Sequence, residues 1–156
     1  MRTREITVNE VKMTFSAIPE NEGFARYTVT ALLMPLDPTV EELSDMRTAV
    51  SEAVTNAIIH GYRGRKDGEV FMSVKTFPDR KITVRVRDEG CGIPDIGKAM
   101  EPLYTTDTSG ERGGMGFAVM KSFTDRLSVR SAEGKGTTVT MTKILSNPEQ
   151  DGGRKI

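Results

Sequence analysis

The sequence predicts one α/β domain of the α+β kind, a two-layer sandwich in which helices cover one face of a mostly antiparallel mixed sheet. Several short segments alternate apolar and polar residues, which is typical of strands with one buried face. Longer segments repeat apolar residues every three or four positions, which is typical of amphipathic helices. Elements of these two kinds bury their apolar sides when the layers pack together, so the pattern favours a sandwich.

A strand and a helix are expected to open the domain. Alternation over residues 11–15 predicts the strand, and a slip of the alternation at Asn9 and Glu10 predicts a break before it. The acidic residues after Pro19 favour a helix start, because the helix dipole attracts negative charge there. Pro35 is expected to end that helix. Its predicted apolar stripe contains Phe24, Thr28, Ala31 and Leu32.

A second helix is expected to begin at Thr39, whose side chain can cap it together with Glu42 three residues later. This helix is expected to end near Gly61. Residues 70–75 and 82–87 alternate on either side of a turn at 78–80, which predicts a β-hairpin.

The rest of the domain is expected to hold loops, helices and a final pair of strands. The stretch from 90 to 112 is interpreted as mostly loop, with a short helix at 96–100. A third main helix follows at 116–124. Strands around 127–129 and 139–141 flank a glycine-rich turn at 133–136. We expect residues 1–145 to form a single domain and residues 146–156 to be a disordered tail.

Composition limits the class of protein. The chain has 156 residues, 37% of them hydrophobic, which fits one domain with a real core. Its 22 basic and 22 acidic residues cancel, and no charge run favours nucleic acid as a direct partner. No apolar run reaches the length of a membrane span, and no apolar signal core follows Met1. A single cysteine, Cys91, fits a reducing compartment. We therefore expect a soluble cytoplasmic protein without a membrane partner.

Glu52 and Asn56 form the first candidate site. They are four residues apart on the second expected helix, so they point the same way, and His60 continues the row. A solvated polar stripe is the ordinary explanation, but the apolar neighbours Val54 and 57–59 favour a cleft. A carboxylate there can take a proton from a hydroxyl group, and an amide oxygen is a suitable ligand for Mg²⁺. For His60, near a helix end, a structural role is the favoured interpretation.

The second candidate site is the run Asp88-Glu89-Gly90-Cys91-Gly92, which follows an expected strand. The Asp88 carboxylate can only accept hydrogen bonds when ionised, so it suits an exocyclic amine of a base. The glycines let a ligand approach the backbone. An ordinary turn explains this motif equally well when it is taken alone.

The third candidate site is the glycine-rich run from Gly110 to Gly116, which leads into an expected helix. Such a loop at a helix N-terminus can bind an anion, and Arg112 adds a positive charge suited to a terminal phosphate. A mobile surface loop is the alternative. The chain has no P-loop motif, and the glycines at 114 and 116 lack the context of a dinucleotide-binding fold.

These motifs occur in an order that resembles the Bergerat-type ATP-binding fold of gyrase, MutL, histidine kinases and a class of heat-shock chaperones. Gly136-Thr137-Thr138 on a late strand completes the order. Within that superfamily the chain resembles the anti-sigma-F factor family of endospore-forming bacteria, over about residues 11–145. The resemblance rests on four segments: Asn21 to Arg26, Ser51 to Tyr62, Glu101 to Thr106 and Glu111 to Phe117.

This resemblance implies a serine-protein kinase that uses ATP and Mg²⁺ and also holds a sporulation sigma factor inactive. It implies that Glu52 is the general base and Asn56 the Mg²⁺ ligand. Asp88 would bind the adenine amino group with support from Thr138, and Gly92 would lie against the base. Residues 105–116 would form a lid over the phosphates. The nucleotide-contacting residues of this lid would be Thr105, Gly110, Arg112, Gly113, Gly114 and Gly116, with Arg112 near the terminal phosphate.

The resemblance also implies protein partners. These are a sigma factor, an anti-anti-sigma factor that serves as the protein substrate, and a second copy of the chain in a homodimer. Arg26 is a candidate contact for the sigma factor or the anti-anti-sigma factor, although a solvated arginine is the usual explanation for such a residue.

Three alternatives stay open at the level of sequence. The chain could be a nucleotide-gated module that sequesters a sigma factor without significant kinase activity, although the intact Glu52 speaks against this. It could be a stress-response anti-sigma kinase of the same family. It could be the ATP domain of a histidine kinase. Against this alternative, we expect that no dimerising helix with a phospho-accepting histidine lies before the first strand.

Overall fold

The structure, a computed structural model, describes residues 5–101 and 116–146. The expected tail lies outside this part of the chain except for Ser146. Five strands form one sheet in the order β1-β2-β3-β5-β4. The strands are β1 (Asn9–Ser16), β2 (Glu69–Phe77), β3 (Lys81–Asp88), β4 (Arg126–Ala132) and β5 (Gly136–Ile144).

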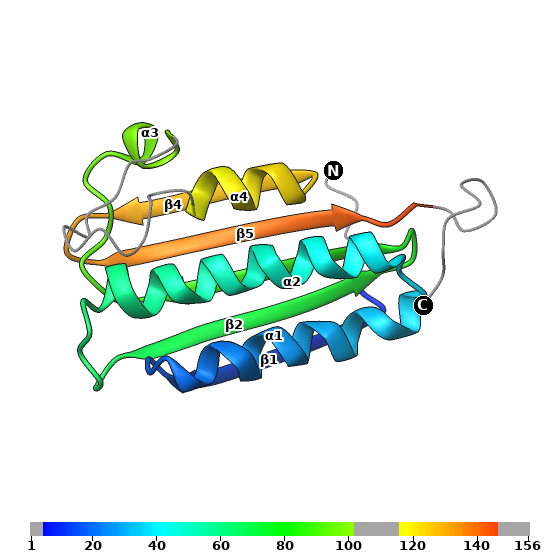
Figure 1. Cartoon of the computed structure of the whole chain (residues 1–156), viewed down its shortest axis with the longest axis horizontal. Coiled ribbons are helices and arrows are strands. Elements are labelled where there is room, and N and C mark those ends of the chain that lie inside the picture. The colour runs from blue at the N-terminus through cyan, green and yellow to red at the C-terminus, as the bar shows by residue number, and fades with distance from the viewer. Residues whose placement is uncertain (1–4, 102–115, 147–156) are drawn as a thin grey trace.

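Every neighbouring pair of strands in this sheet is antiparallel. The described sheet is therefore antiparallel throughout, whereas the sequence predicted a mostly antiparallel sheet with some parallel pairing. The connections explain the difference. Tight turns join β2 to β3 and β4 to β5, and tight turns reverse the chain. Two successive helices join β1 to β2, and the chain reverses direction at each of the three junctions, from β1 to α1, from α1 to α2 and from α2 to β2, so β2 runs opposite to β1 (Figure 1).

The helices lie on one face of the sheet and form the second layer, as predicted (Figure 1). The main ones are α1 (Glu20–Leu33), α2 (Val40–Thr55) and α4 (Gly116–Phe123). A 3₁₀ turn (Met34–Leu36) follows α1, and the short helix α3 (Ile96–Ala99) precedes the undescribed segment. Helix α2 packs between α1 and α4, so it is the central helix of this layer.

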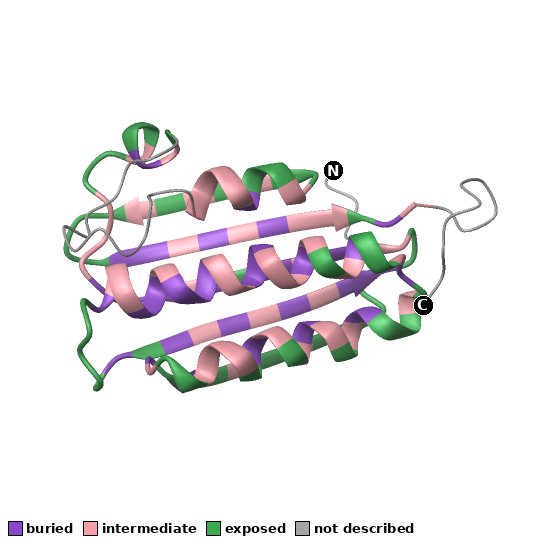
Figure 2. Ribbon diagram, viewed as in Figure 1, coloured by how far each residue is buried: buried purple, intermediate pink, exposed green. Residues whose placement is uncertain are grey.

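The core lies between the two layers, and burial alternates along the strands (Figure 2). Ile82, Val84 and Val86 of β3 are buried and face the helices, and Asp88 continues that buried row. No helix formed by residues 5–101 or 116–146 covers the opposite face of the sheet (Figure 1). A polar residue at the end of a buried row therefore lies at the edge of the core, next to the ends of the helices.

The apolar stripe predicted for the first helix is wrong by one position. The residues of α1 that face the core are Ala25, Val29 and Leu33, whereas Phe24 is 57% exposed. The small side chain of Ala25 allows α1 to approach α2 and the sheet closely, which a phenylalanine at the same place would prevent.

Helix α2 begins with the predicted capping box. The Thr39 hydroxyl accepts a hydrogen bond from the Glu42 amide at 3.1 Å, and Glu42 Oε1 accepts one from the Thr39 amide at 2.9 Å. Glu42 Oε2 also accepts a hydrogen bond from the Ser146 amide at 2.7 Å. One carboxylate thus fixes the start of α2 to the chain that leaves β5.

The end of α2 differs from a regular helix. Residues Asn56–Gly61 form a π-helix, η2, in which the Tyr62 amide donates to the Ala57 carbonyl five residues earlier at 3.1 Å. Single π turns inside helices are frequent at functional sites. The helical chain therefore ends near Gly61 as predicted, but its last turns are wider than expected. Among the described helices, none is long and apolar enough to cross a membrane.

Candidate functional site

The site is built around Asp88, the last residue of β3. Its side chain is 6% exposed, and its Oδ1 atom accepts a hydrogen bond from the Gly90 amide at 2.9 Å. Burial raises the pKa of Asp88 to about 6, because a charged carboxylate loses its hydration there. Backbone hydrogen bonds from Gly90 and Thr137 and the positive charge of Arg87 lower the pKa and oppose this shift. Asp88 is therefore a buried acceptor at the edge of the core.

The turn after Asp88 is attached to the end of the π-helix. The Cys91 amide donates to the Gly61 carbonyl at 2.8 Å, and the Cys91 thiol donates to the His60 carbonyl at 3.2 Å. A Cβ atom on Gly90 would lie 2.0 Å from the Gly61 carbonyl oxygen, so only glycine permits this approach. Gly61 in turn lies against the Asp88 carboxylate, because a Cβ atom on Gly61 would be 2.8 Å from Asp88 Oδ1. Asp88, the turn and η2 therefore form one packed unit.

Tyr62 holds this unit to the sheet, although no motif in the sequence pointed to it. Its hydroxyl donates to the Glu69 carbonyl at 2.5 Å and accepts from the Glu89 amide at 2.8 Å. The ring is 4% exposed. The signal in the sequence was an aromatic residue directly after the expected helix end, but its partners lie on β2 and in the turn after β3, which only the fold brings near it.

Thr137, not Thr138, lies beside Asp88. Thr137 is the residue of β5 that pairs with Asp88, and it is buried on the face covered by helices. Thr138 pairs with Arg87 and Arg130 and lies on the uncovered face. Because side chains alternate along a strand, a shift by one residue moves the side chain to the other face. This placement corrects the prediction that Thr138 supports Asp88.

Gly92 lies against the turn between β4 and β5. It has a φ of 74°, and a Cβ atom there would lie 2.2 Å from the Ala132 carbonyl oxygen. The Gly134 amide donates to the Cys91 carbonyl at 2.7 Å, which holds the two turns together. This packing explains why position 92 needs a glycine. The contact of Gly92 with the adenine base stays a prediction.

Glu52 and Asn56 meet Gly116 at the start of α4. A Cβ atom on Gly116 would lie 2.9 Å from Asn56 Nδ2 and 3.3 Å from Glu52 Oε2. The sequence predicted that Glu52 and Asn56 share a face, and the structure brings both against the first residue of α4. The absence of a side chain at Gly116 lets the N-terminus of α4 approach a carboxylate and an amide.

The other predicted lid residues lie outside the described part of the chain. They are Thr105, Gly110, Arg112, Gly113 and Gly114. Gly116 is the one residue of the predicted glycine-rich site that the structure describes.

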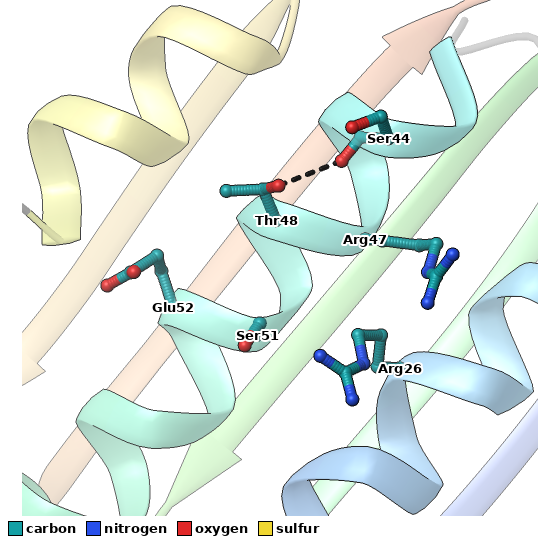
Figure 3. A pocket seen from close by; sticks show the side chains of 6 residues that line it. All are labelled: Arg26, Ser44, Arg47, Thr48, Ser51 and Glu52. Atoms are coloured by element: carbon teal, nitrogen blue, oxygen red, sulfur yellow. Dashed lines mark hydrogen bonds between the residues drawn. The ribbon is translucent and has the colours of Figure 1, made fainter. Parts of the chain in front are cut away.

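A pocket opens beside Glu52, between α1 and α2 (Figure 3). Helix α1 contributes Arg26, and the remaining lining residues come from α2 (Figure 3). They are Ser44, Arg47, Thr48, Ser51 and Glu52. Arg26 therefore lines the same pocket as the predicted catalytic residue Glu52, and Arg47 is a lining residue to which no sequence motif pointed.

The arrangement supports two kinds of chemistry. Asp88 can accept a hydrogen bond from an amine in a dry setting, and the Glu52 carboxylate can accept a proton from a hydroxyl. Among the described residues, no group of three or more histidine, cysteine, aspartate or glutamate side chains could hold a metal ion. The amide oxygen of Asn56 still suits Mg²⁺, because that ion is commonly held by one or two protein oxygens together with phosphates and water.

Comparison with known proteins places this geometry in a family. The family model described as histidine kinase-like ATPase domain matches residues 15–143. The anti-sigma F factors of Bacillus thuringiensis (strain Al Hakam) and Bacillus mycoides (strain KBAB4) are each 50% identical to the chain over 139 residues. These alignments cover 89% of this chain and 94% of each relative.

Solved structures share the fold. The RsbU and RsbW domains of a Mycobacterium tuberculosis protein match 90% of this chain and 34% of that one, with a TM-score of 0.63 and 21% identity. The catalytic domain of the histidine kinase ThkA matches 89% of this chain and 98% of that one, with a TM-score of 0.56 and 16% identity. These similarities show that the chain shares the fold of these domains.

Proposed function

Because this chain belongs to the histidine kinase-like ATPase family and, within it, to the anti-sigma F factors, we propose that it is an anti-sigma factor and serine-protein kinase. It binds and inhibits a sporulation sigma factor, and it transfers a phosphoryl group from Mg-ATP to a serine of its anti-anti-sigma factor. It works in the cytoplasm as a homodimer. The observation that carries the kinase proposal is the meeting of Glu52 and Asn56 with the start of α4.

Asp88 recognises the adenine base in this proposal. The ionised carboxylate accepts a hydrogen bond from the exocyclic amine of adenine. Guanine presents a carbonyl oxygen at the corresponding position, so it would face the carboxylate without a donor. Thr137, which lies beside Asp88 in the neighbouring strand, takes the supporting role that was predicted for Thr138.

Glu52 acts on the acceptor hydroxyl. It orients the serine oxygen toward the terminal phosphorus and takes the hydroxyl proton, while the bond from that phosphorus to the oxygen shared with ADP breaks. Asn56 would hold Mg²⁺ through its amide oxygen, and the bound ion would neutralise charge on the phosphates. Phosphoryl transfer depends mainly on such positioning and charge stabilisation, so few protein groups suffice.

The segment that precedes α4 closes over the phosphates in this proposal. Gly116 begins α4, and the amides at the start of a helix favour an anion. Arg112 contacts the terminal phosphate. Thr105, Gly110, Gly113 and Gly114 contribute backbone or hydroxyl contacts, and Gly92 lies against the base.

Transfer of labelled phosphate from ATP tests the proposal. The purified protein is mixed with labelled ATP and with the anti-anti-sigma factor of the same organism, and the labelled residue is mapped by mass spectrometry. Label on a serine of that protein is the expected result. Absence of transfer would leave a nucleotide-gated module that sequesters a sigma factor, and label on a histidine would indicate histidine-kinase chemistry.

Two further measurements test the partners. Purification from the host is expected to recover a sporulation sigma factor, and recovery of a stress-response sigma factor instead would place the protein in the other branch of the family. Solution mass with and without nucleotide is expected to be that of a dimer. A monomer under both conditions would contradict the homodimer.

A further inference from the structure

The pocket between α1 and α2 is lined by polar side chains, and those from α2 recur at helical spacing. Its α2 residues follow the helical repeat and form a single stripe on that helix, which ends at the predicted base, Glu52 (Figure 3). The stripe consists of Ser44, Arg47, Thr48, Ser51 and Glu52. Arg26 approaches this stripe from α1. The pocket lining thus contains two positively charged residues and the residue that we propose as the catalytic base.

The two arginines are incompletely paired. The Nε atoms of Arg26 and Arg47 are buried and have no hydrogen-bond partner among the described residues. Arg26 Nε lies 3.8 Å from Glu22 Oε1, whereas Arg47 forms no ion pair within residues 5–101 and 116–146. Buried donors without partners cost free energy, which a bound acceptor would recover.

The two guanidinium groups also lie near the same aromatic ring. Both approach the ring of Tyr27, with centroid distances of 5.6 Å for Arg26 and 5.8 Å for Arg47. Figure 3 shows both groups in the space between the two helices. Like charges that line one pocket repel, and an anion bound in the pocket would relieve the repulsion.

We propose that this pocket binds the carboxylate of an acidic side chain near the target serine of the substrate protein, and that Arg47 is a specificity-determining residue. The inference rests on the proposed kinase function. The anion is a carboxylate and not a phosphate, because Glu22 and Glu52 border the site and would repel a doubly charged group more strongly than a singly charged one. Guanidinium groups bind carboxylates through paired hydrogen bonds.

The spacing along α2 limits where the acidic residue lies in the substrate. Arg47 precedes Glu52 by five positions, which separates the two residues by about 7.5 Å along the helix axis and by about 140° around it. An extended chain advances roughly 3.3 Å per residue, so the acidic residue lies within about three positions of the serine. The pocket therefore selects a short segment with an acidic residue close to the acceptor.

Kinetics of an Arg47→Ala variant test the proposal. Loss of a contact that is equal in the ground state and the transition state raises KM and leaves kcat unchanged, so we expect KM for the acceptor protein to rise roughly tenfold. ATP affinity is expected to stay unchanged. Arg47→Lys, which keeps the charge without the planar fork, is expected to give a smaller rise. The matched control is Arg85→Ala, because Arg85 is exposed on the uncovered face of the sheet.

A charge exchange gives a second readout. Arg47→Glu is combined with acceptor variants in which each acidic residue within three positions of the phosphorylated serine is changed to lysine. Recovery of the low KM in one pair supports the proposal. An unchanged KM in Arg47→Ala, or recovery in none of the pairs, overturns it.

The two proposals can fail separately. If the wild-type protein transfers no phosphate, the kinase function fails, and the affinity of the acceptor protein for the wild type and for Arg47→Ala still decides whether the pocket binds it. Equal affinities then overturn the pocket, and weaker binding by Arg47→Ala supports it. Circular dichroism and thermal unfolding establish that each variant is folded.

Discussion

The two ends of the candidate site are built in different ways. Asp88 is buried, accepts a backbone hydrogen bond and belongs to a unit of turns in which added side chains would collide with backbone. Glu52 is partly exposed, lines an open pocket and lies at the meeting of two helices. The end that we assign to the base is therefore fixed by the sheet, and the end that we assign to transfer depends on how helices pack.

This difference agrees with the proposed division of labour. Recognition of a flat base gains from a rigid acceptor, because little ordering remains to be done on binding. Transfer to a protein requires access for a second chain, which a buried carboxylate would not have. Changes at the Asp88 end should therefore alter folding and nucleotide affinity, whereas changes at the Glu52 end should alter transfer alone.

The largest expected effect is on the packed turn. Gly90→Ala places a methyl group 2.0 Å from the Gly61 carbonyl, so the turn or η2 must move. We expect a loss of roughly 4 kcal/mol or more in the free energy of unfolding, which is in the range of severe core substitutions. Urea denaturation measures it. Gly97→Ala is the control, because its Cβ would lie 3.4 Å from Asp95 Oδ1, an ordinary contact. Similar stabilities of the two variants would contradict the rigid turn.

The next effect concerns transfer at the other end. Glu52→Gln keeps the shape of the side chain and removes the proton acceptor. We expect kcat for phosphoryl transfer to fall about 10²- to 10⁴-fold, the usual contribution of a general base. A folded variant that transfers phosphate at the wild-type rate would show that Glu52 is not the base.

The third effect is a pH dependence of stability at Asp88. Its pKa of about 6 in the folded protein exceeds its ordinary value of 3.8, so the folded protein holds this proton more tightly than the unfolded chain does. The resulting stabilisation is present below about pH 4 and is lost as pH rises through 6. It amounts to roughly 3 kcal/mol.

Asp88→Asn isolates this contribution, because the amide does not titrate. The free energy of unfolding of the wild type, less that of the variant, should fall between pH 4 and 6 and stay constant at higher pH. Denaturation of both proteins across this range gives the difference. A difference that does not change with pH would mean that Asp88 is not buried as described.

The smallest effect concerns the hydroxyl that holds the turn to β2. Tyr62→Phe leaves the Glu89 amide and the Glu69 carbonyl without this partner, which costs about 1–3 kcal/mol in stability. Tyr27→Phe is the control, because Tyr27 is exposed. Equal stability losses in the two variants would show that the Tyr62 hydroxyl is dispensable.

The sequence predicted most of the elements because the local signals were strong. The capping box of α2, the hairpin of β2 and β3 and the start of α4 lie where residue patterns indicated them. Glu52 and Asn56 share a face because helical spacing alone determines that relation.

The remaining features depend on tertiary structure. Thr137 and Thr138 both fit the motif, and only the register of β5 against β3 decides which one faces Asp88. The hydroxyl partners of Tyr62 lie on β2 and in the turn after β3. The pocket with Arg26 and Arg47 requires the packing of α1 on α2, which periodicity within either helix does not reveal.

The most direct test of the divided site is a parallel titration of ATP into Asp88→Asn and Glu52→Gln by calorimetry at pH 7.5. The account predicts that Asp88→Asn binds ATP roughly tenfold or more weakly than the wild type, because a charge-assisted hydrogen bond is lost. It predicts that Glu52→Gln binds ATP with nearly wild-type affinity. Wild-type affinity in Asp88→Asn together with lost affinity in Glu52→Gln would contradict the assignment of the two ends.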